Sequence, residues 1–396
     1  MERKKLQELR SSNRRWAVLF ASFLTFLAFA FVFQLMPPLL TRVADEFTVD
    51  EVRVGLLMSL TVIPGIILAL PTGLVVNKYG FRWLGFVSLL LVASGSLVTA
   101  LAQSFALTLL GRFILGVGGA FIVVGVPTII PQWFGHKELG KAMGLYGTNM
   151  PVATILAFPT ATVLAQNFND WRYPFYVGSV LAVLVAVVFV AVVREGPMKG
   201  ERTPIGLTEV KKAVRNSEIW KASLVWMFFN AAAIAYLSWA KVLFETFKGL
   251  QPIEASIFAS VLMYAAVVFV PLFGWASDKT ERRKPFLVVG SIAMALALIV
   301  TSFSSGLMLV VSVILLGIAA ASVPPVVMTI PPQNSPPNLA GTAFSIVTLC
   351  QNIGIAFSAP YAGYLIQTTQ HLPSIFLGIS LFPLVAAAAA LTLKTK

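Results

Sequence analysis

Long runs without charged residues are the feature that most constrains the fold of this chain. Residues 285–393 contain no Asp, Glu, Lys or Arg at all. Across 396 residues, 58% are apolar and only 11% carry a formal charge, whereas soluble proteins average about 25% charged residues. So little polar surface cannot cover soluble domains of this size, and the apolar and aromatic content also excludes a disordered chain. The sequence therefore predicts a protein that lies mostly in lipid.

The uncharged runs have the length of membrane-spanning helices. A helix needs about 20 mostly apolar residues to cross the hydrocarbon core, while the strands of a membrane barrel are about 10 residues long and alternate in polarity. We therefore expect an all-α, polytopic membrane protein with twelve transmembrane helices. The predicted spans are residues 16–40, 54–76, 83–102, 105–131, 141–166, 173–193, 218–240, 254–276, 286–303, 306–329, 339–366 and 373–392.

Basic residues divide unevenly between the two faces of this arrangement. The net charge of +13 would suggest a nucleic-acid partner in a soluble protein, but 23 of the 29 Lys and Arg residues fall in the loops and termini of one face. This bias predicts a multi-pass protein of the cell membrane with cytoplasmic N- and C-termini, and it argues against nucleic acid. The first run is too long for a signal peptide and is interpreted as a retained span. The opposite face is expected to hold only Arg42, Arg53, Arg172, Lys241 and Lys248.

Short sequence matches recur at one offset of 201 residues. The segment from Gly73 to Lys78 matches the segment from Gly274 to Lys279, and two further Gly-containing pairs share the same offset. A repeat near half the chain length predicts two six-helix bundles related by an axis along the membrane normal. We expect an N-terminal bundle over residues 1–193, a cytoplasmic linker over 194–217 and a C-terminal bundle over 218–396. The linker reads either as a short amphipathic helix on the inner leaflet or as an irregular charged loop.

At these motifs the chain resembles the Major Facilitator Superfamily over nearly its whole length. The resemblance implies a secondary transporter whose two bundles rock about a central substrate site, with a conformational latch at the cytoplasmic end. Asn77 stands where the family has Asp, which weakens the first-half latch, and Met150 precedes Pro151 where the family's antiporters have Gly. The span-four signature appears as Arg112, Gly116, Gly118 and Ala120, and the latch residues are Gly73, Asn77, Lys78, Gly80, Arg82, Gly274, Asp278, Lys279, Arg282 and Arg283.

Arg112 is the only cation that lies well inside a predicted span, away from its ends. A charge in the hydrocarbon core is costly, so such a residue is expected to face a cavity and to have a partner. Gln34 lies at a similar predicted depth and is the candidate neighbour. We interpret Arg112 as the group that attracts an anionic substrate. The alternative is that Arg112 hydrogen-bonds only to backbone and to Gln34, and holds spans one and four together.

Polar side chains converge near the middle of several other spans. Transporter sites lie near the bilayer midplane between the repeats, so these groups are predicted to line the pathway; hydrogen bonding between helices is the alternative for each. No acidic residue lies in the middle of a predicted span, so a coupled proton would travel on the substrate or through a helix-end acid such as Glu245 or Glu254. The predicted lining residues are Asn149, Asn230, Tyr264, Gln351 and Asn352, with Tyr146, Tyr236 and Tyr361 as further candidates.

The sequence gives no sign of an enzyme. It has no catalytic triad pattern, nucleotide fingerprint or metal-ligand cluster, so no cofactor and no metal are expected. We predict a monomeric alternating-access transporter for a small organic or inorganic anion, with the bilayer as its surroundings. A drug/proton or lipid exporter of the same fold is the first alternative. A receptor or scaffold that does not transport is the second.

Overall fold

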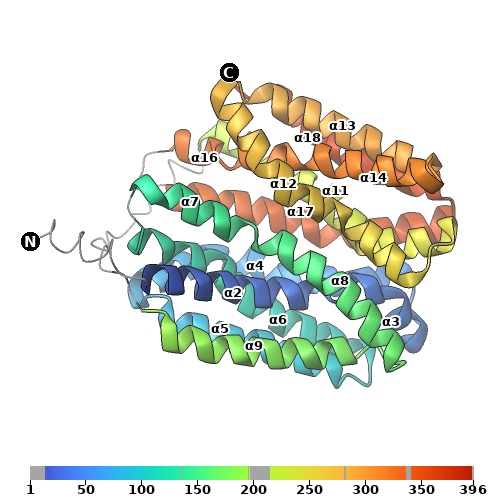
Figure 1. Ribbon diagram of the computed structural model, residues 1–396, viewed down its shortest axis with the longest axis horizontal. Helices are drawn as coiled ribbons and strands as arrows, with labels where there is room; N and C mark the ends of the chain where they lie inside the picture. The colour runs from blue at the N-terminus through green and yellow to red at the C-terminus, as the bar shows by residue number, and fades with distance from the viewer. Residues whose placement is uncertain are drawn as a thin grey trace, which may run out of the picture.

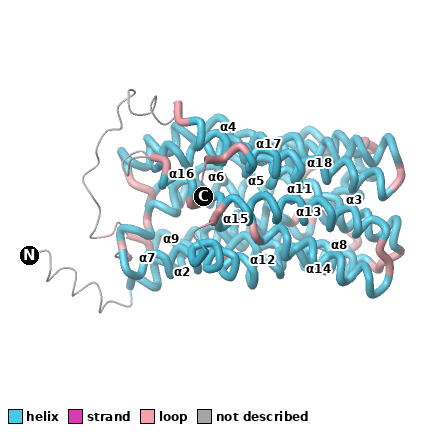
Figure 2. The backbone as a smooth tube through the Cα atoms, turned by 90° about the horizontal axis from the view of Figure 1, so that it is seen from above, coloured by secondary structure: helices cyan, strands magenta, loops and turns pink. Residues whose placement is uncertain are grey.

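The chain folds into a bundle of long helices that run roughly parallel to one another (Figures 1 and 2). The computed structural model describes residues 14–134, 136–194, 196, 215–280, 282–335 and 340–394. Within these residues, twelve helices are long and apolar enough to cross a membrane. The predicted fold class is confirmed: the protein is all-α and multi-pass, with two six-helix halves.

The first half begins at α2 and ends at α9. Several of its spans are interrupted, so that one crossing is made of two or three helical pieces. Its elements are α2 (Arg14–Gln34), η1 (Pro37–Leu39), α3 (Leu40–Phe47), α4 (Glu51–Tyr79), α5 (Arg82–Ala100), α6 (Phe105–Gly125), η2 (Val126–Thr128), η3 (Ile130–Gln132), α7 (His136–Gly147), α8 (Asn149–Asn167) and α9 (Tyr173–Val192).

The second half repeats this order. Its elements are α11 (Ser217–Lys248), α12 (Pro252–Thr280), α13 (Lys284–Phe303), α14 (Gly306–Ala321), α15 (Val323–Val327), α16 (Ile330–Gln333), α17 (Ala340–Thr369) and α18 (Leu372–Leu391). Helices α4 and α12 both have 29 residues, and their first residues are 201 positions apart. The helices of the structure therefore repeat at the same 201-residue offset as the matching sequence segments.

Local chemistry sets the helix ends and the breaks within spans. The side chains of Asp50 and Ser104 cap α4 and α6 by accepting from backbone N–H groups of the first turn, which satisfies donors that have no partner inside the helix. Gly249 ends α11 with a positive φ of 66°, a conformation that glycine adopts without strain. The fifth span breaks at Thr148, just before Pro151, and the tenth breaks at Ser322, just before Pro324.

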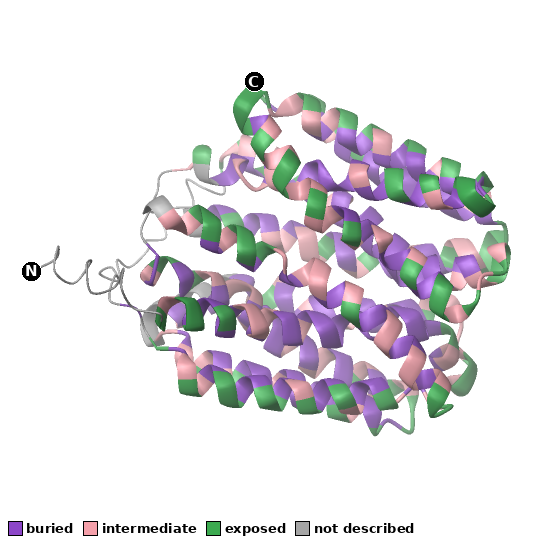
Figure 3. Cartoon of the chain, viewed as in Figure 1, coloured by how far each residue is buried: buried purple, intermediate pink, exposed green. Residues whose placement is uncertain are grey.

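Burial follows the expected pattern for a bundle in lipid. Exposed residues gather on the outward surfaces of the helices, and buried residues face the neighbouring helices (Figure 3). Inside the first half, small residues allow close helix contact: Gly116 of α6 lies against the backbone carbonyl of Thr61 in α4. A larger residue there would force the two helices apart.

The seventh span differs from its predicted length. Helix α11 continues to Lys248, so Lys241 lies within the helix and not in a loop, as the charge pattern had suggested. Lys241 is 8% exposed and pairs with Glu245 one turn further on, at 2.8 Å between Nζ and Oε1. The ion pair lowers the cost of each charge, and the helix can therefore extend beyond the first cation. Nearly all of the predicted linker, 194–217, lies outside the described residues.

Candidate functional site

The two halves meet along two helix pairs, α4 with α17 and α8 with α12. Their close contacts gather at the end of the molecule opposite the described chain ends, which we call the far end (right in Figure 1). A methyl group placed on Gly55 would lie 2.8 Å from the backbone nitrogen of Pro360. Thr162 Oγ1 lies 2.5 Å from Ser256 Oγ. Small side chains thus bring the two halves into direct contact at the far end.

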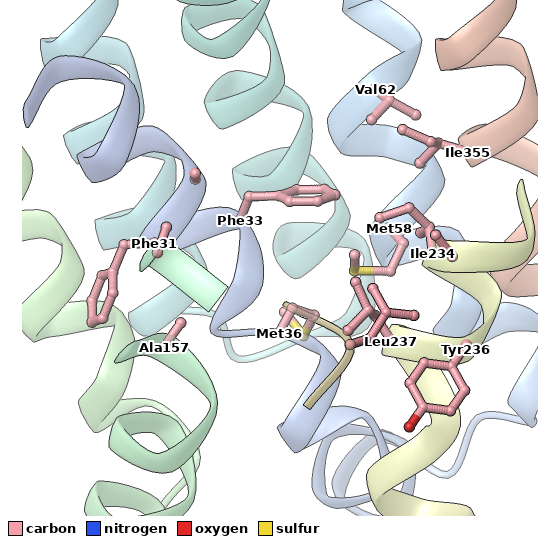
Figure 4. Packing of buried hydrophobic residues seen from close by; sticks show 14 of the residues in the cluster. Phe31, Phe33, Met36, Met58, Val62, Ala157, Ile234, Tyr236, Leu237 and Ile355 are labelled. Atoms are coloured by element: carbon pink, nitrogen blue, oxygen red, sulfur yellow. The ribbon is translucent and has the colours of Figure 1, made fainter. Parts of the chain in front are cut away.

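A cluster of apolar side chains fills the seam between the halves next to these contacts. Met36 and Met58 come from the first half, and Ile234 and Leu237 come from α11 of the second half (Figure 4). All four are at most 4% exposed. We call this set the apolar seal. Closely packed apolar side chains leave no polar partner for a hydrated ion.

Two side-chain hydrogen bonds at the opposite, terminal end each join residues of a single half. Arg15 donates to Glu138 with 2.6 Å between Nη1 and Oε2, and both residues belong to the first half. Asn216 donates to the carbonyl oxygen of Asn334 in the second half at 2.6 Å. The Gly55–Pro360 and Thr162–Ser256 contacts between the halves thus lie at the far end.

Arg112 is completely buried in α6. Its guanidinium donates to three backbone carbonyls, those of Leu57 at 3.1 Å, Val32 at 3.3 Å and Phe33 at 3.2 Å. It also contacts the sulfur of Met58, a residue of the seal, at 3.9 Å. Arg112 thus links α2, α4 and α6 immediately behind the seal, and among the described residues its charge meets carbonyl dipoles, the Met58 sulfur and the ring of Phe33.

Gln34 and Arg112 have different hydrogen-bond partners. The Gln34 side-chain nitrogen donates to Thr154 Oγ1 of α8 at 2.8 Å. Asn149 and Tyr146 precede Thr154 in the same span, one on each side of the break at Thr148, and both are buried. Neither the Asn149 amide nitrogen nor the Tyr146 hydroxyl makes a hydrogen bond of good geometry, although the two side chains are close enough to interact. We call Gln34, Tyr146, Asn149 and Thr154 the first polar cluster.

A second polar cluster joins α11 to α17. Trp226 Nε1 donates to Gln351 Oε1 at 3.0 Å, and Gln351 Nε2 donates to Asn230 Oδ1 at 3.4 Å. The structure thus brings together two residues predicted from the sequence and adds Trp226, which was missed. Its indole N–H, one helical turn before Asn230, was the available signal. Asn352 is next to this cluster but faces Gly65 of α4, across the boundary between the halves.

The two clusters lie on equivalent spans of the repeat. The first is formed by spans one and five, and the second by spans seven and eleven. Asn230 lies near the middle of the 32-residue helix α11, whereas Gln34 is the last residue of α2. N–H and O–H donors of this kind could hold a small polar substrate.

Three of the predicted tyrosines do not join these clusters. Tyr264 shares one face of α12 with the exposed side chains of Ile257, Val268 and Trp275, and such an apolar exposed face is the one that contacts lipid. Tyr236 packs inside the second half against Phe244 and Phe376. Tyr361 packs against Phe382 of α18. Their predicted role as lining residues has no support from these positions.

The latch residues contact groups within their own half where the structure describes them. Arg82 donates to the carbonyl oxygen of Val190 at 3.0 Å, and Gly80 ends α4 with a φ of 80°. Lys279 lies over the ring of Trp275 at 4.9 Å, and Gly274 lies beside Pro325. Asp278 ends α12 together with Lys279, and Arg282 and Arg283 precede α13. The side chains of Asn77 and Lys78, and the surroundings of Gly73, lie outside the described residues. The latch stays a prediction.

Comparison with known proteins agrees with this architecture. The sequence profile of the Major Facilitator Superfamily matches residues 18–262 and 246–396. The chain is 25% identical over 360 residues to a "Probable nitrate transporter NarT" of Staphylococcus carnosus (strain TM300), covering 88% of this chain and 89% of that protein. It is 24% identical over 293 residues to a "Nitrite extrusion protein" of Bacillus subtilis (strain 168), covering 74% of this chain and 72% of that protein.

Two solved structures share the fold at lower sequence identity. A bacterial homologue of the human lysosomal transporter Spinster, solved in an inward-facing and occupied conformation, superimposes with a TM-score of 0.81 at 19% identity and covers 98% of each chain. The nucleoside transporter NupG superimposes with a TM-score of 0.79 at 13% identity, covering 96% of this chain and 100% of that one. At these identities the likeness is one of fold.

Proposed function

The chain belongs to the Major Facilitator Superfamily, and on this premise we propose that it carries a small inorganic oxyanion, nitrate or nitrite, by alternating access. The names of the two relatives point to these anions. Nitrate and nitrite are small, singly charged and poor hydrogen-bond acceptors. A site for them needs a positive potential and a few N–H donors, and it needs no acid facing the ion.

One observation carries the proposal: the buried charge of Arg112 has no counter-ion. Among the described residues, no carboxylate forms an ion pair with it. Carbonyl dipoles orient the guanidinium without neutralising it, and the low dielectric of the bundle leaves its field poorly screened. The polar clusters therefore lie in a positive potential that favours an anion over a neutral or cationic substrate.

The polar clusters supply the contacts that a bound oxyanion requires. We assign the anion to the space between the two clusters, with donors from Asn149 in the first half and from Asn230 and Gln351 in the second. Because the donors come from both halves, an anion bound between them draws the halves together. In this scheme Arg112 acts through its field and does not touch the substrate in the conformation seen here.

We further propose that the terminal end faces the cytoplasm. The 23 basic residues on that side support this orientation, which makes the far end extracellular and the present conformation closed to the outside. Residues 1–193 and 218–396 are then the units that rock. A single copy contains both clusters, so we propose a monomer. Glu245, the acid on the pathway face of α11, is our candidate for a coupled proton.

Nitrate flux in proteoliposomes tests the proposal. We expect saturable nitrate uptake by the native protein, inhibited by nitrite and not by nucleosides. Arg112→Gln should reduce uptake by at least about tenfold, the factor that corresponds to 1.4 kcal/mol of lost interaction. Arg112→Lys keeps the charge but not the planar fork, so it should retain more uptake than Arg112→Gln. Arg53, an exposed cation at the far end, provides the control Arg53→Gln, with uptake near that of the native protein.

Two results would contradict the proposal. Native protein that carries no nitrate or nitrite, in a preparation that binds another solute, would end the oxyanion assignment. Unchanged nitrate uptake by Arg112→Gln would remove Arg112 from the mechanism. Because Arg112 links three helices, each variant must first elute as a single species with a melting temperature close to that of the native protein.

A further inference from the structure

One face of α11 runs through the whole pathway and changes character along it. Trp226 and Asn230 belong to the second polar cluster, and Ile234 and Leu237 belong to the apolar seal. The same spacing of three or four residues continues to Lys241 and Glu245, so these two charges share the face that meets the first half. Eleven residues separate Asn230 from Lys241, about 16 Å along the helix. From the middle of the bundle to the far end, the side chains on this face are therefore first polar, then apolar and finally charged.

The charged part of this face lies at the seam between the halves. Lys241 is 8% exposed and its Nζ lies 2.8 Å from Glu245 Oε1. Helix α11 contacts α3 of the first half, which carries Arg42. Arg42 donates to the carbonyl oxygen of Ala165 at 2.6 Å. Two cations, one from each half, thus lie on contacting helices at the seam, and of the two only Lys241 is seen to pair with a carboxylate.

Several other far-end charges are paired within the first half. Arg172 binds Glu46 through both oxygens, at 2.5 Å and 2.9 Å, and its side-chain hydrogen bond with Glu46 raises the pKa of Arg172 above its usual value. Asp50 caps α4 and pairs with the exposed Arg53. These pairs lie within the first half. They therefore do not neutralise the excess positive charge between Arg42 and Lys241.

We propose that Arg42 and Lys241 form a second anion-binding subsite, which captures a small inorganic oxyanion at the far end before it crosses the seal. The inference rests on the proposed function. In the conformation seen here Glu245 forms an ion pair with Lys241, and the two halves are in contact at the far end. When the halves part at the far end, water and anions reach both cations, and the oxyanion takes the place of Glu245 beside Lys241.

Electrostatics gives this subsite a clear role. A cleft lined by one sign of charge raises the local concentration of its counter-ion and the rate at which the ion enters. The seal offers an anion no polar partner. An anion that is already bound just outside the seal can be enclosed as soon as the two halves close at the far end. Arg112 lies behind the seal and Lys241 lies beyond it, which places positive charge on both sides of the apolar barrier.

The subsite predicts an effect that depends on the side from which the anion enters. We would measure nitrate exchange in right-side-out and inside-out membrane vesicles, because exchange needs no net coupling to another ion. Lys241→Gln should raise the KM for nitrate presented at the far end about tenfold, while the KM from the terminal end stays within about twofold of the native value. The double variant Lys241→Gln/Glu245→Gln removes the pair without leaving a lone buried acid, and it should show the same asymmetry.

Arg53→Gln is the matched control, because it removes another far-end cation that pairs with an acid on its own helix end; its KM values should match those of the native protein from both sides. A far-end KM that is unchanged in both Lys241 variants would overturn the inference. A KM raised equally from both sides would also overturn it, since that result indicates a structural role for the ion pair. Native vesicles without saturable nitrate exchange would instead overturn the proposed function, and this inference with it.

Discussion

The buried side chains differ in how much their chemistry can be inferred from sequence. Arg112 was identified because a charge within an apolar run is rare and costly. Backbone partners were one of the two alternatives for Arg112, but the sequence does not say which carbonyls they are, because any backbone carbonyl satisfies a guanidinium donor. Tyr264 was chosen for its depth alone, and its side chain lies on an exposed face of α12. The depth of a residue in the membrane follows from counting residues along its span. The direction of its side chain depends on which neighbouring helices the span packs against.

Gln351 provides a residue-scale test of the second polar cluster. Gln351→Ala removes the acceptor for Trp226 Nε1 and the donor to Asn230, so we expect a KM for nitrate about tenfold higher, as for the loss of one or two hydrogen bonds to a charged ligand. Gln351→Glu keeps the shape but adds a negative charge, and it should abolish nitrate uptake. Tyr264→Phe, on the lipid-facing side, serves as control and should leave uptake unchanged. Equal effects of Gln351→Ala and Tyr264→Phe in the flux assay would contradict the cluster.

Among the helices, α11 departs most informatively from its predicted form. The span was expected to end before Lys241, because cations usually mark the edge of the hydrocarbon. A partner one turn later, Glu245, lets the helix continue for two more turns. The fifth and tenth spans break just before Pro151 and Pro324, where proline removes a backbone donor and clashes with the preceding turn. Local rules therefore explain the breaks, and only a side-chain pairing could reveal the extension.

Substitutions at two glycines can distinguish helix packing within one half from helix packing between the halves. Gly116 lies against the backbone of Thr61 in the same half, while Gly55 lies against Pro360 of the other half. Gly116→Val should lower the free energy of unfolding by about 1–3 kcal/mol, the usual cost of overpacking. Gly55→Val should leave the melting temperature closer to the native value, because the halves can part at the far end without disrupting either bundle.

Thiol labelling measures whether the two halves part at the far end in Gly55→Val. In a Cys350→Ser background with Cys in place of the buried Leu237, Gly55→Val should increase the rate of labelling from the far end several-fold. A large loss of melting temperature in Gly55→Val, with no increase in labelling, would mean that the far-end contacts are permanent.

For the whole molecule, the architecture is duplicated but the charge is not. The 201-residue offset places Val313 where the first half has Arg112, and Leu40 where the second half has Lys241. Apolar run length, loop charge and the repeat were enough to predict twelve helices in two halves. The pathway could not be predicted to the same degree, because it depends on contacts between helices from different halves, and no sequence interval encodes those contacts.

A cross-link at the far end tests whether the two halves move as units. Thr162 of α8 and Ser256 of α12 have side-chain oxygens 2.5 Å apart, so cysteines at both positions, in the Cys350→Ser background, are close enough to form a disulfide. Oxidation should hold the far end closed and reduce nitrate flux to the background level. Reduction should restore the flux, which separates locking from damage.

A second cysteine pair inside one half provides the control. A side chain at Gly178 of α9 would place its Cβ 3.2 Å from Ser96 Oγ of α5, so Ser96→Cys/Gly178→Cys can also form a disulfide. Both helices belong to the first half and should move together, so oxidation of this pair should leave the flux unchanged. Full transport by the oxidised Thr162→Cys/Ser256→Cys protein, with the cross-link verified by mass spectrometry, would show that the pathway opens without separation of α8 from α12. The rocking of two rigid halves would then have to be abandoned.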